Sequence, residues 1–306
     1  MSTILIINDN SSEARHAAEF ALIIAQKMQA DILLLNTIEI NEKDFCKVPA
    51  DAFFDSCTDN CDCFPYPVSD KVVKGELFKP CPDACNCVDY PASGVRYRLK
   101  TLNDGTTNFK PRVEEVDVSF TSESEVIELV IKRQVWMIIK GMANTITEPE
   151  INRTFNVHSV LNRVLCPLLL VPETWPLKNI ERLTYIADLR YCRIQIVRYL
   201  AALAKPWNAN LSIGHVTAPG LTEMAEAYAR EVFAEEVCKK VNYDQLFFNN
   251  IREKDLLIAV DVIVNGMQND LLVLVNRHFH FEEIVGRYIT NILPGHITVP
   301  LLVFPF

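Results

Sequence analysis

The first 39 residues contain the pattern that most restricts how this chain can fold. Apolar residues 4–7 lead into a polar corner at residues 8–12 and then into a stretch with apolar residues at three- and four-residue steps. A second apolar run follows at residues 32–35. This order is typical of a strand–helix–strand unit. Because both runs are apolar on both faces, we expect a parallel sheet that is covered by helices on each side.

The plan of this unit returns in the second half of the chain. From Leu183 the sequence LTYIADLRYCRIQIVRYLAALAKPWNANLSIGHV again passes from an apolar run through a polar corner and a helical stretch to an apolar run. Asp188 stands where Asp9 stood. Internal similarity of this kind indicates a duplicated fold. We therefore predict two tandem α/β domains, residues 1–174 and 179–306, each with a Rossmann-like parallel sheet.

The two halves also end alike, with CPLLLVP at Pro172 and VPLLVFP at Pro305. An apolar closing strand at the edge of a sheet needs a partner, because its unpaired backbone groups are open to unwanted association. We expect the two domains to pair with each other about a pseudo-twofold axis through these strands. A homodimer is a second way to cover such an edge.

These features together resemble the universal stress protein family, and the whole chain is similar to a tandem two-domain member. The resemblance rests on the opening ILIINDNSSEARHAAEFALIIA, the Asp188 corner, Gly141 after the fourth apolar run and the two closures. It implies five-stranded sheets of order 3-2-1-4-5, helices on both faces and a non-enzymatic role in a stress response with protein partners unknown. It also implies that a ligand would lie between the Asp9 corner and the loop after Gly141, where the strand order reverses.

ATP-binding members of the family carry a Gly-x2-Gly-x9-Gly-Ser/Thr pattern at that point, since glycine amides can approach phosphates closely. Gly141 aligns with the first glycine, but Asn144 stands at the second, and Thr154 and Phe155 stand at the Gly-Ser pair. The corresponding loop of the second half has no glycine after its fourth strand. Asp9, Gly141 and Asn144 are the candidate nucleotide site, and this incomplete pattern predicts that ATP binding is lost. An ATP-binding regulatory switch that uses Asp9 and Gly141 is the alternative function.

Residues 41–110 interrupt the first domain and contain two cysteine segments of equal spacing, Cys-x3-Cys-x-Cys. Close thiolates joined by short polar turns are suited to a soft cation, and zinc takes four such ligands in a tetrahedron. We predict a zinc site in this insertion, either with four ligands or as a two-metal cluster. Disulfides, or a thiol redox sensor, are the alternatives. The candidate ligands are Cys57, Cys61, Cys63, Cys81, Cys85 and Cys87.

Charge and hydropathy exclude several classes of protein. The formal net charge is -9 and the pI is about 5.3, which disfavours a broad surface for nucleic acid or anionic membrane. The chain opens directly into a strand, and its apolar runs are too short to span a membrane. We expect a cytoplasmic protein without nucleic-acid or membrane partners.

Two further stretches and one absence complete the sequence-based expectations. Asp104 and Gly105 predict a hairpin turn near the end of the insertion. The stretch HFHFEE, with His278 and His280, offers ligands for a divalent ion, but we favour an exposed loop there. The sequence contains no nucleophile elbow, paired-carboxylate site or zinc-protease motif, which favours a protein without enzymatic activity.

Overall fold

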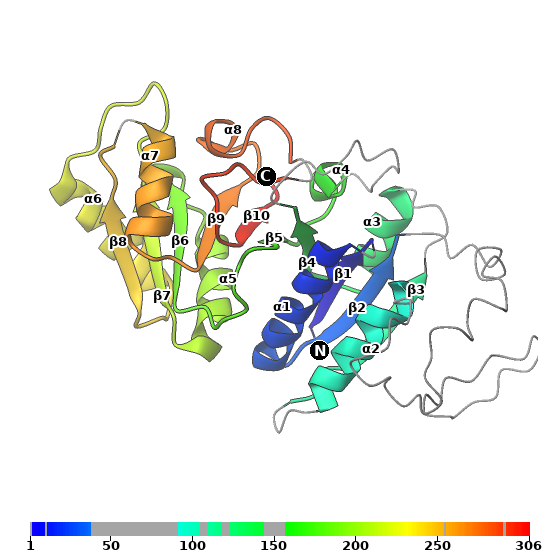
Figure 1. The fold of residues 1–306 in the computed structure, drawn as a ribbon. Helices are drawn as coiled ribbons and strands as arrows, with labels where there is room; N and C mark the ends of the chain where they lie inside the picture. The colour runs from blue at the N-terminus through cyan, green and yellow to red at the C-terminus, as the bar shows by residue number, and fades with distance from the viewer. Residues whose placement is uncertain are drawn as a thin grey trace, which may run out of the picture.

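The computed structural model describes residues 2–9, 11–37, 91–104, 109–117, 123–143, 157–253, 255–289 and 292–306. These residues form one continuous ten-stranded sheet with helices on both faces (Figure 1). The order of its strands is β3-β2-β1-β4-β5-β10-β9-β6-β7-β8. The α/β fold class predicted from the sequence is thus confirmed.

The first half of the chain supplies five parallel strands in the predicted order 3-2-1-4-5. They are β1 (Thr3–Asn8), β2 (Asp31–Asn36), β3 (Val113–Asp117), β4 (Val135–Met142) and β5 (Leu168–Pro172). The second half repeats the order, since β6 pairs with β7 and β9, β7 with β8, and β9 with β10. Its strands are β6 (Arg182–Ala187), β7 (Asn210–His215), β8 (Leu246–Asn250), β9 (Leu271–Val275) and β10 (Leu301–Phe304).

The two five-stranded halves join through their closing strands. Strand β10 runs antiparallel to β5, with Leu301 opposite Leu170 and Val303 opposite Leu168. All four side chains are buried. This is the pairing expected from the apolar closures CPLLLVP and VPLLVFP, and it converts two predicted sheets into a single one. The domain boundaries at residues 174 and 179 stay a prediction.

Helices cover the two faces of the sheet, and each face has its own apolar core. On one face lie α1 (Ser12–Met28), α2 (Pro91–Asp104), α5 (Ile194–Ala204) and α6 (Glu226–Val232). On the other face lie α3 (Glu123–Lys132), α4 (Val157–Leu161), α7 (Leu256–Asp261) and α8 (Phe281–Ile284). Among the described helices, none combines the length and the apolar character needed to cross a membrane.

Helix α1 illustrates how local sequence produces these elements. Ser11 accepts a 3.0 Å hydrogen bond from the backbone N–H of Ala14 and so caps the first turn. Gln29 ends the helix in the left-handed conformation, with φ at 53°. The side chains at three- and four-residue steps are buried against β1 and β4, as the sequence predicted, and they include Ala14, Ala17, Ala18, Ala21 and Ala25.

The predicted hairpin turn is wrong, because residues up to Asp104 form helix α2. Val95 and Leu99 are four residues apart and are both buried, so one face of this helix packs on the core. The Asp104–Gly105 pair follows the end of a helix. The segment from residue 91 to residue 104 therefore belongs to the connection between β2 and β3 and not to an irregular insertion.

Candidate functional site

The strand order reverses twice in this sheet, once between β1 and β4 and once between β6 and β9. In open parallel sheets, ligands bind beyond the carboxyl ends of the strands at such switch points. Asp9 and Gly141 lie at the first switch point, as the sequence predicted, because they follow β1 and lie near the end of β4. Asn144, the third residue of the candidate nucleotide site, lies outside the described residues.

The Asp9 carboxylate organises the corner between β1 and α1. Its Oδ1 accepts hydrogen bonds from the backbone N–H of Ser11 at 3.2 Å and from the Ser11 hydroxyl at 2.5 Å. Its Oδ2 lies 4.0 Å from the ammonium group of Lys140 on β4. The Asp9 side chain is 24% exposed, so one side of the carboxylate can still reach a ligand. Asp9 thus acts as the turn residue that an aspartate at such a corner commonly provides.

Gly141 is required by packing between β4 and α1. A Cβ atom at this position would lie 2.1 Å from the carbonyl oxygen of Glu13 and 2.7 Å from the amide nitrogen of Ala14. No side chain fits there, because these contacts are to backbone in the first turn of α1. The glycine allows the strand and the helix to approach closely, which is a structural reason for its presence that does not involve a phosphate.

Lys140 is a residue at this switch point that the sequence-based reasoning did not identify. It lies on β4 between Ile7 of β1 and Leu170 of β5, and its side chain is only 6% exposed. A buried ammonium group costs free energy unless it is paired, and Asp9 at 4.0 Å is the ion-pair partner that the described part of the chain provides. The signal in the sequence was a single lysine within the apolar run VWMIIKG.

A row of polar side chains continues along the carboxyl ends of the neighbouring strands. The Asn8 amide donates to Asn36 Oδ1 at 2.7 Å, and the Asn36 amide donates to Glu115 Oε1 at 2.7 Å. Arg96 of α2 pairs with the second oxygen of Glu115 at 3.1 Å. This chain of contacts connects β1, β2 and β3 at one edge. In the sequence, both asparagines directly follow an apolar strand, which was the available signal.

Asp188 lies at the second switch point and is fully buried. Its Oδ1 accepts hydrogen bonds from the Arg190 backbone N–H at 3.0 Å and from Arg190 Nε at 2.9 Å. Its Oδ2 accepts from Arg190 Nη2 at 2.6 Å and from the backbone N–H of Ala218 at 2.8 Å. Burial would raise the pKa of Asp188, but the hydrogen bonds from Arg190 and Ala218 outweigh it and hold the pKa below its usual value. The carboxylate is therefore fully engaged by the chain itself.

Two buried histidines stand beside Asp188. His215 Nδ1 accepts a hydrogen bond from the backbone N–H of Leu189 at 3.2 Å, and His280 Nε2 lies 3.3 Å from the carbonyl oxygen of Val216. The remaining ring nitrogen of each histidine is buried and has no hydrogen-bond partner among the described residues. Burial is the main cause that lowers the pKa of both rings.

The interpretation of HFHFEE as an exposed loop is wrong for His280, which is only 6% exposed. Phe281 next to it is also buried, because α8 packs this end of the loop onto the core around β9 and β10. Within the described residues, no group of three or more His, Cys, Asp or Glu side chains could hold a metal ion. The loop is thus a packed connection and not a metal site.

The six cysteines of the predicted zinc site, residues 57–87, lie outside the described residues, so this site stays a prediction. The described cysteines are of a different kind. Burial raises the pKa of Cys166 and of Cys192 to about 12, which keeps both as neutral thiols near pH 7. Cys238 is exposed.

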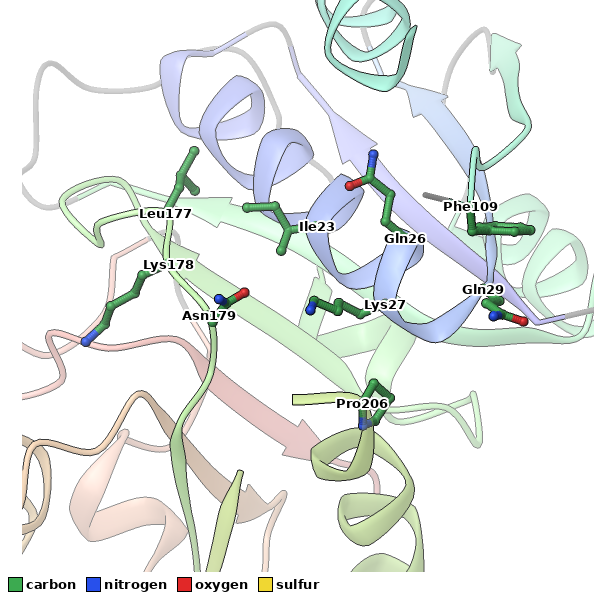
Figure 2. Close-up of a pocket in the computed structure, with 9 residues that line it drawn as sticks. All are labelled: Ile23, Gln26, Lys27, Gln29, Phe109, Leu177, Lys178, Asn179 and Pro206. Carbon is green, nitrogen blue, oxygen red and sulfur yellow. The ribbon is translucent and has the colours of Figure 1, made fainter. Parts of the chain in front are cut away.

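A surface pocket of about 630 Å³ lies between α1 and the connection from β5 to β6 (Figure 2). Figure 2 shows Ile23, Gln26 and Lys27 on α1 and Leu177, Lys178 and Asn179 on the facing connection. This pocket lies near the amino-terminal ends of the strands, away from Asp9 and Asp188. Lys178 is already paired with Asp270 at 2.6 Å and lies 4.7 Å above the Trp175 ring. We therefore place the candidate functional site at the switch points.

Three solved structures share the fold over nearly the whole chain. A universal stress protein from Archaeoglobus fulgidus matches with a TM-score of 0.56 and 12% identity, over 99% of this chain and 98% of that one. A putative universal stress protein from Pseudomonas aeruginosa UCBPP-PA14 matches with a TM-score of 0.53 and 12% identity, over 100% and 93%. A functionally unknown protein from Pseudomonas aeruginosa PAO1 matches with a TM-score of 0.53 and 11% identity, over 100% and 92%. No protein-family model and no curated protein matches the sequence.

Proposed function

We propose that the chain is a non-enzymatic stress-response protein of the universal stress type, which acts in the cytoplasm through binding. The fold shared with universal stress protein structures supports the class. The observation that carries the proposal is that the chain's own groups occupy the conserved positions of both corners. Arg190 and Ala218 take up the Asp188 carboxylate, and the Gly141 backbone faces the first turn of α1.

The test is complementation in a bacterial host that lacks its own universal stress proteins. Expression of this chain is expected to restore survival under heat or oxidative stress, and Asp9→Ala is expected to restore it equally. The purified chain is expected to show no nucleotide hydrolysis above the buffer rate. Hydrolysis that disappears in Asp9→Ala, or a failure to restore survival by a folded protein, would contradict the proposal.

We further propose that the two Cys-x3-Cys-x-Cys segments bind zinc. Their equal spacing supports this, since short polar turns allow thiolates to converge on one ion. Elemental analysis of the purified chain is expected to find zinc, and replacement of the six cysteines by serine is expected to remove it. Cys238→Ser is the matched control, because this thiol is exposed but lies outside the segments. Metal-free protein with intact thiols, or mapped disulfides between the segments, would refute zinc binding.

Nucleotide binding at the first switch point is the second candidate, and one observation favours it. The buried ammonium group of Lys140 lies beside the partly exposed Asp9, so a positive charge is present where a phosphate would lie in this fold. Calorimetric titration with ATP tests it. Binding that is lost in both Lys140→Met and Asp9→Ala would support this candidate, and the absence of heat in the wild type would exclude it.

A further inference from the structure

The ten-stranded sheet has two outer edges, and only one of them carries charged side chains. Strand β3 at one edge has the sequence VEEVD, in which Glu114 pairs with Arg133 and Glu115 pairs with Arg96. Strand β8 at the other edge has the uncharged sequence LFFNN. Proteins commonly use charges to prevent pairing at a free edge. Strand β8 has no such protection.

The backbone of β8 presents a regular set of free groups to the outside. Gln245 accepts from the N–H of Leu211, and Ile251 donates to the carbonyl of His215, both at 2.9 Å. Since backbone direction alternates along a strand, the odd-numbered residues face β7. The N–H and C=O groups of Leu246, Phe248 and Asn250 therefore point away from the sheet. No strand follows β8 in the part of the chain that the structure describes.

Apolar side chains accompany this edge on the face that α7 covers. Leu246 and Phe248 pack on the opposite face, so Phe247 points to the α7 side, where it is 47% exposed. On the α7 side, Ile258 is 51% exposed, and Val262, which follows α7, is 52% exposed. A free strand edge with adjoining exposed apolar groups is typical of an association surface.

We propose that β8 is the dimer interface of this protein, where a second copy adds its own β8 in antiparallel orientation about a two-fold axis at Phe248. In this register, Phe248 lies opposite Phe248 of the partner subunit, and Leu246 lies opposite Asn250 of the partner subunit. All these residues present outward backbone groups, so three pairs can exchange about six hydrogen bonds. The strand is therefore complementary to itself.

The two-fold symmetry explains why the occupant is a second copy and not an unrelated strand. An axis perpendicular to the sheet keeps each face on the same side in both subunits, so the two α7 helices and their exposed apolar residues lie on one face. The chain already closes an edge by antiparallel pairing, where β5 meets β10. The interface at β8 uses the same type of contact between subunits, and it lies at the opposite end of the second half from β10.

Sedimentation equilibrium tests the proposal. The wild type is expected to have twice the chain mass of 34.8 kDa at micromolar concentration. Phe247→Lys introduces the protective charge that β8 lacks, and we expect it to weaken the dimer at least tenfold. Asn250→Pro removes an outward N–H without breaking the contact to β7, and we expect a similar loss. Leu165→Lys, at a residue that is 96% exposed on the other half, is expected to leave the dimer intact.

A chemical cross-link tests the register separately. Residues in a hydrogen-bonded antiparallel pair have Cα atoms about 5.5 Å apart, within the range of a disulfide. In Phe248→Cys, mild oxidation is expected to link residue 248 to residue 248 of the second copy, as detected by peptide mass mapping. A monomeric wild type, a dimer that Phe247→Lys and Asn250→Pro both leave unchanged, or links from residue 248 only to other cysteines would overturn the proposal.

Discussion

The side-chain amide of Asn276 donates a 2.9 Å hydrogen bond to the side-chain oxygen of Asn162, which connects the two halves of the chain next to the β5–β10 junction. Asn276 follows β9 and is fully buried, whereas Asn162 follows α4 and is exposed. Nearby, the backbone N–H of Ile289 donates to His158 Nδ1 at 3.5 Å. The loops that follow the fourth strand of each half are therefore in direct contact.

The Asn276–Asn162 contact predicts an asymmetric response to mutation. Asn162→Ala leaves the buried Asn276 amide without its partner and should lower the free energy of unfolding by about 1–3 kcal/mol. A double-mutant cycle with Asn276→Ala should give a coupling of about 0.5–1.5 kcal/mol, measured by urea unfolding. Asn179→Ala, at an exposed asparagine outside this contact, is the control. A coupling near zero would show that the halves are not joined through this pair.

Gly141→Ala should be strongly destabilising. The added Cβ would lie 2.1 Å from the Glu13 carbonyl oxygen, so β4 and α1 would have to separate. Overpacking of this kind costs about 1–3 kcal/mol or more, which urea unfolding would detect. Gly295→Ala is the matched control, because a Cβ there meets no atom within 4 Å, and its effect should be within about 0.5 kcal/mol. Wild-type stability of Gly141→Ala would refute the packing role.

His215 and His280 predict a loss of stability in mild acid. Burial lowers the pKa of both rings in the folded state below the usual value of 6.5. The folded state therefore disfavours protonation, and the stabilisation is present above pH 6.5 and is lost as the pH falls below it. The free energy of unfolding should decrease from pH 7 to pH 5 in the wild type and much less in the double variant His215→Leu, His280→Leu. An equal slope in both proteins would exclude these histidines as the cause.

Lys140→Met should leave stability unchanged or raise it by about 1–2 kcal/mol in the absence of ligand. The ammonium group is buried, and its partner Asp9 is 4.0 Å away, so the cost of desolvation is only partly offset. Methionine has a similar shape and no charge. Thermal unfolding measures the effect, with Lys178→Met as the control for an exposed lysine that has a close partner at 2.6 Å. Strong destabilisation by Lys140→Met would show that the charge is fully compensated in the fold.

Much of the fold could be predicted because it depends on local pattern. The apolar runs of β1, β5 and β10 and the spacing of alanines in α1 identify their elements directly, and the repeat fixes the strand order in each half. Helix α2 was missed because Asp104 and Gly105 suggest a turn equally well at a hairpin and after a helix. At the candidate site, Asp9, Gly141 and Asp188 were identified, whereas Lys140 and His215 were not, because their roles depend on residues distant in sequence.

The amino-acid sequence by itself determined the duplicated α/β plan, the two apolar closures and the aspartate corners, since each follows from residues within one or two turns of chain. Only the tertiary structure decided that β5 and β10 join the halves into one sheet, that Arg190 and Ala218 engage Asp188, and that Gly141 contacts α1. The physical reason is that hydrogen bonds and close packing between elements act across long separations in the chain. Periodicity describes the element and does not describe its neighbour.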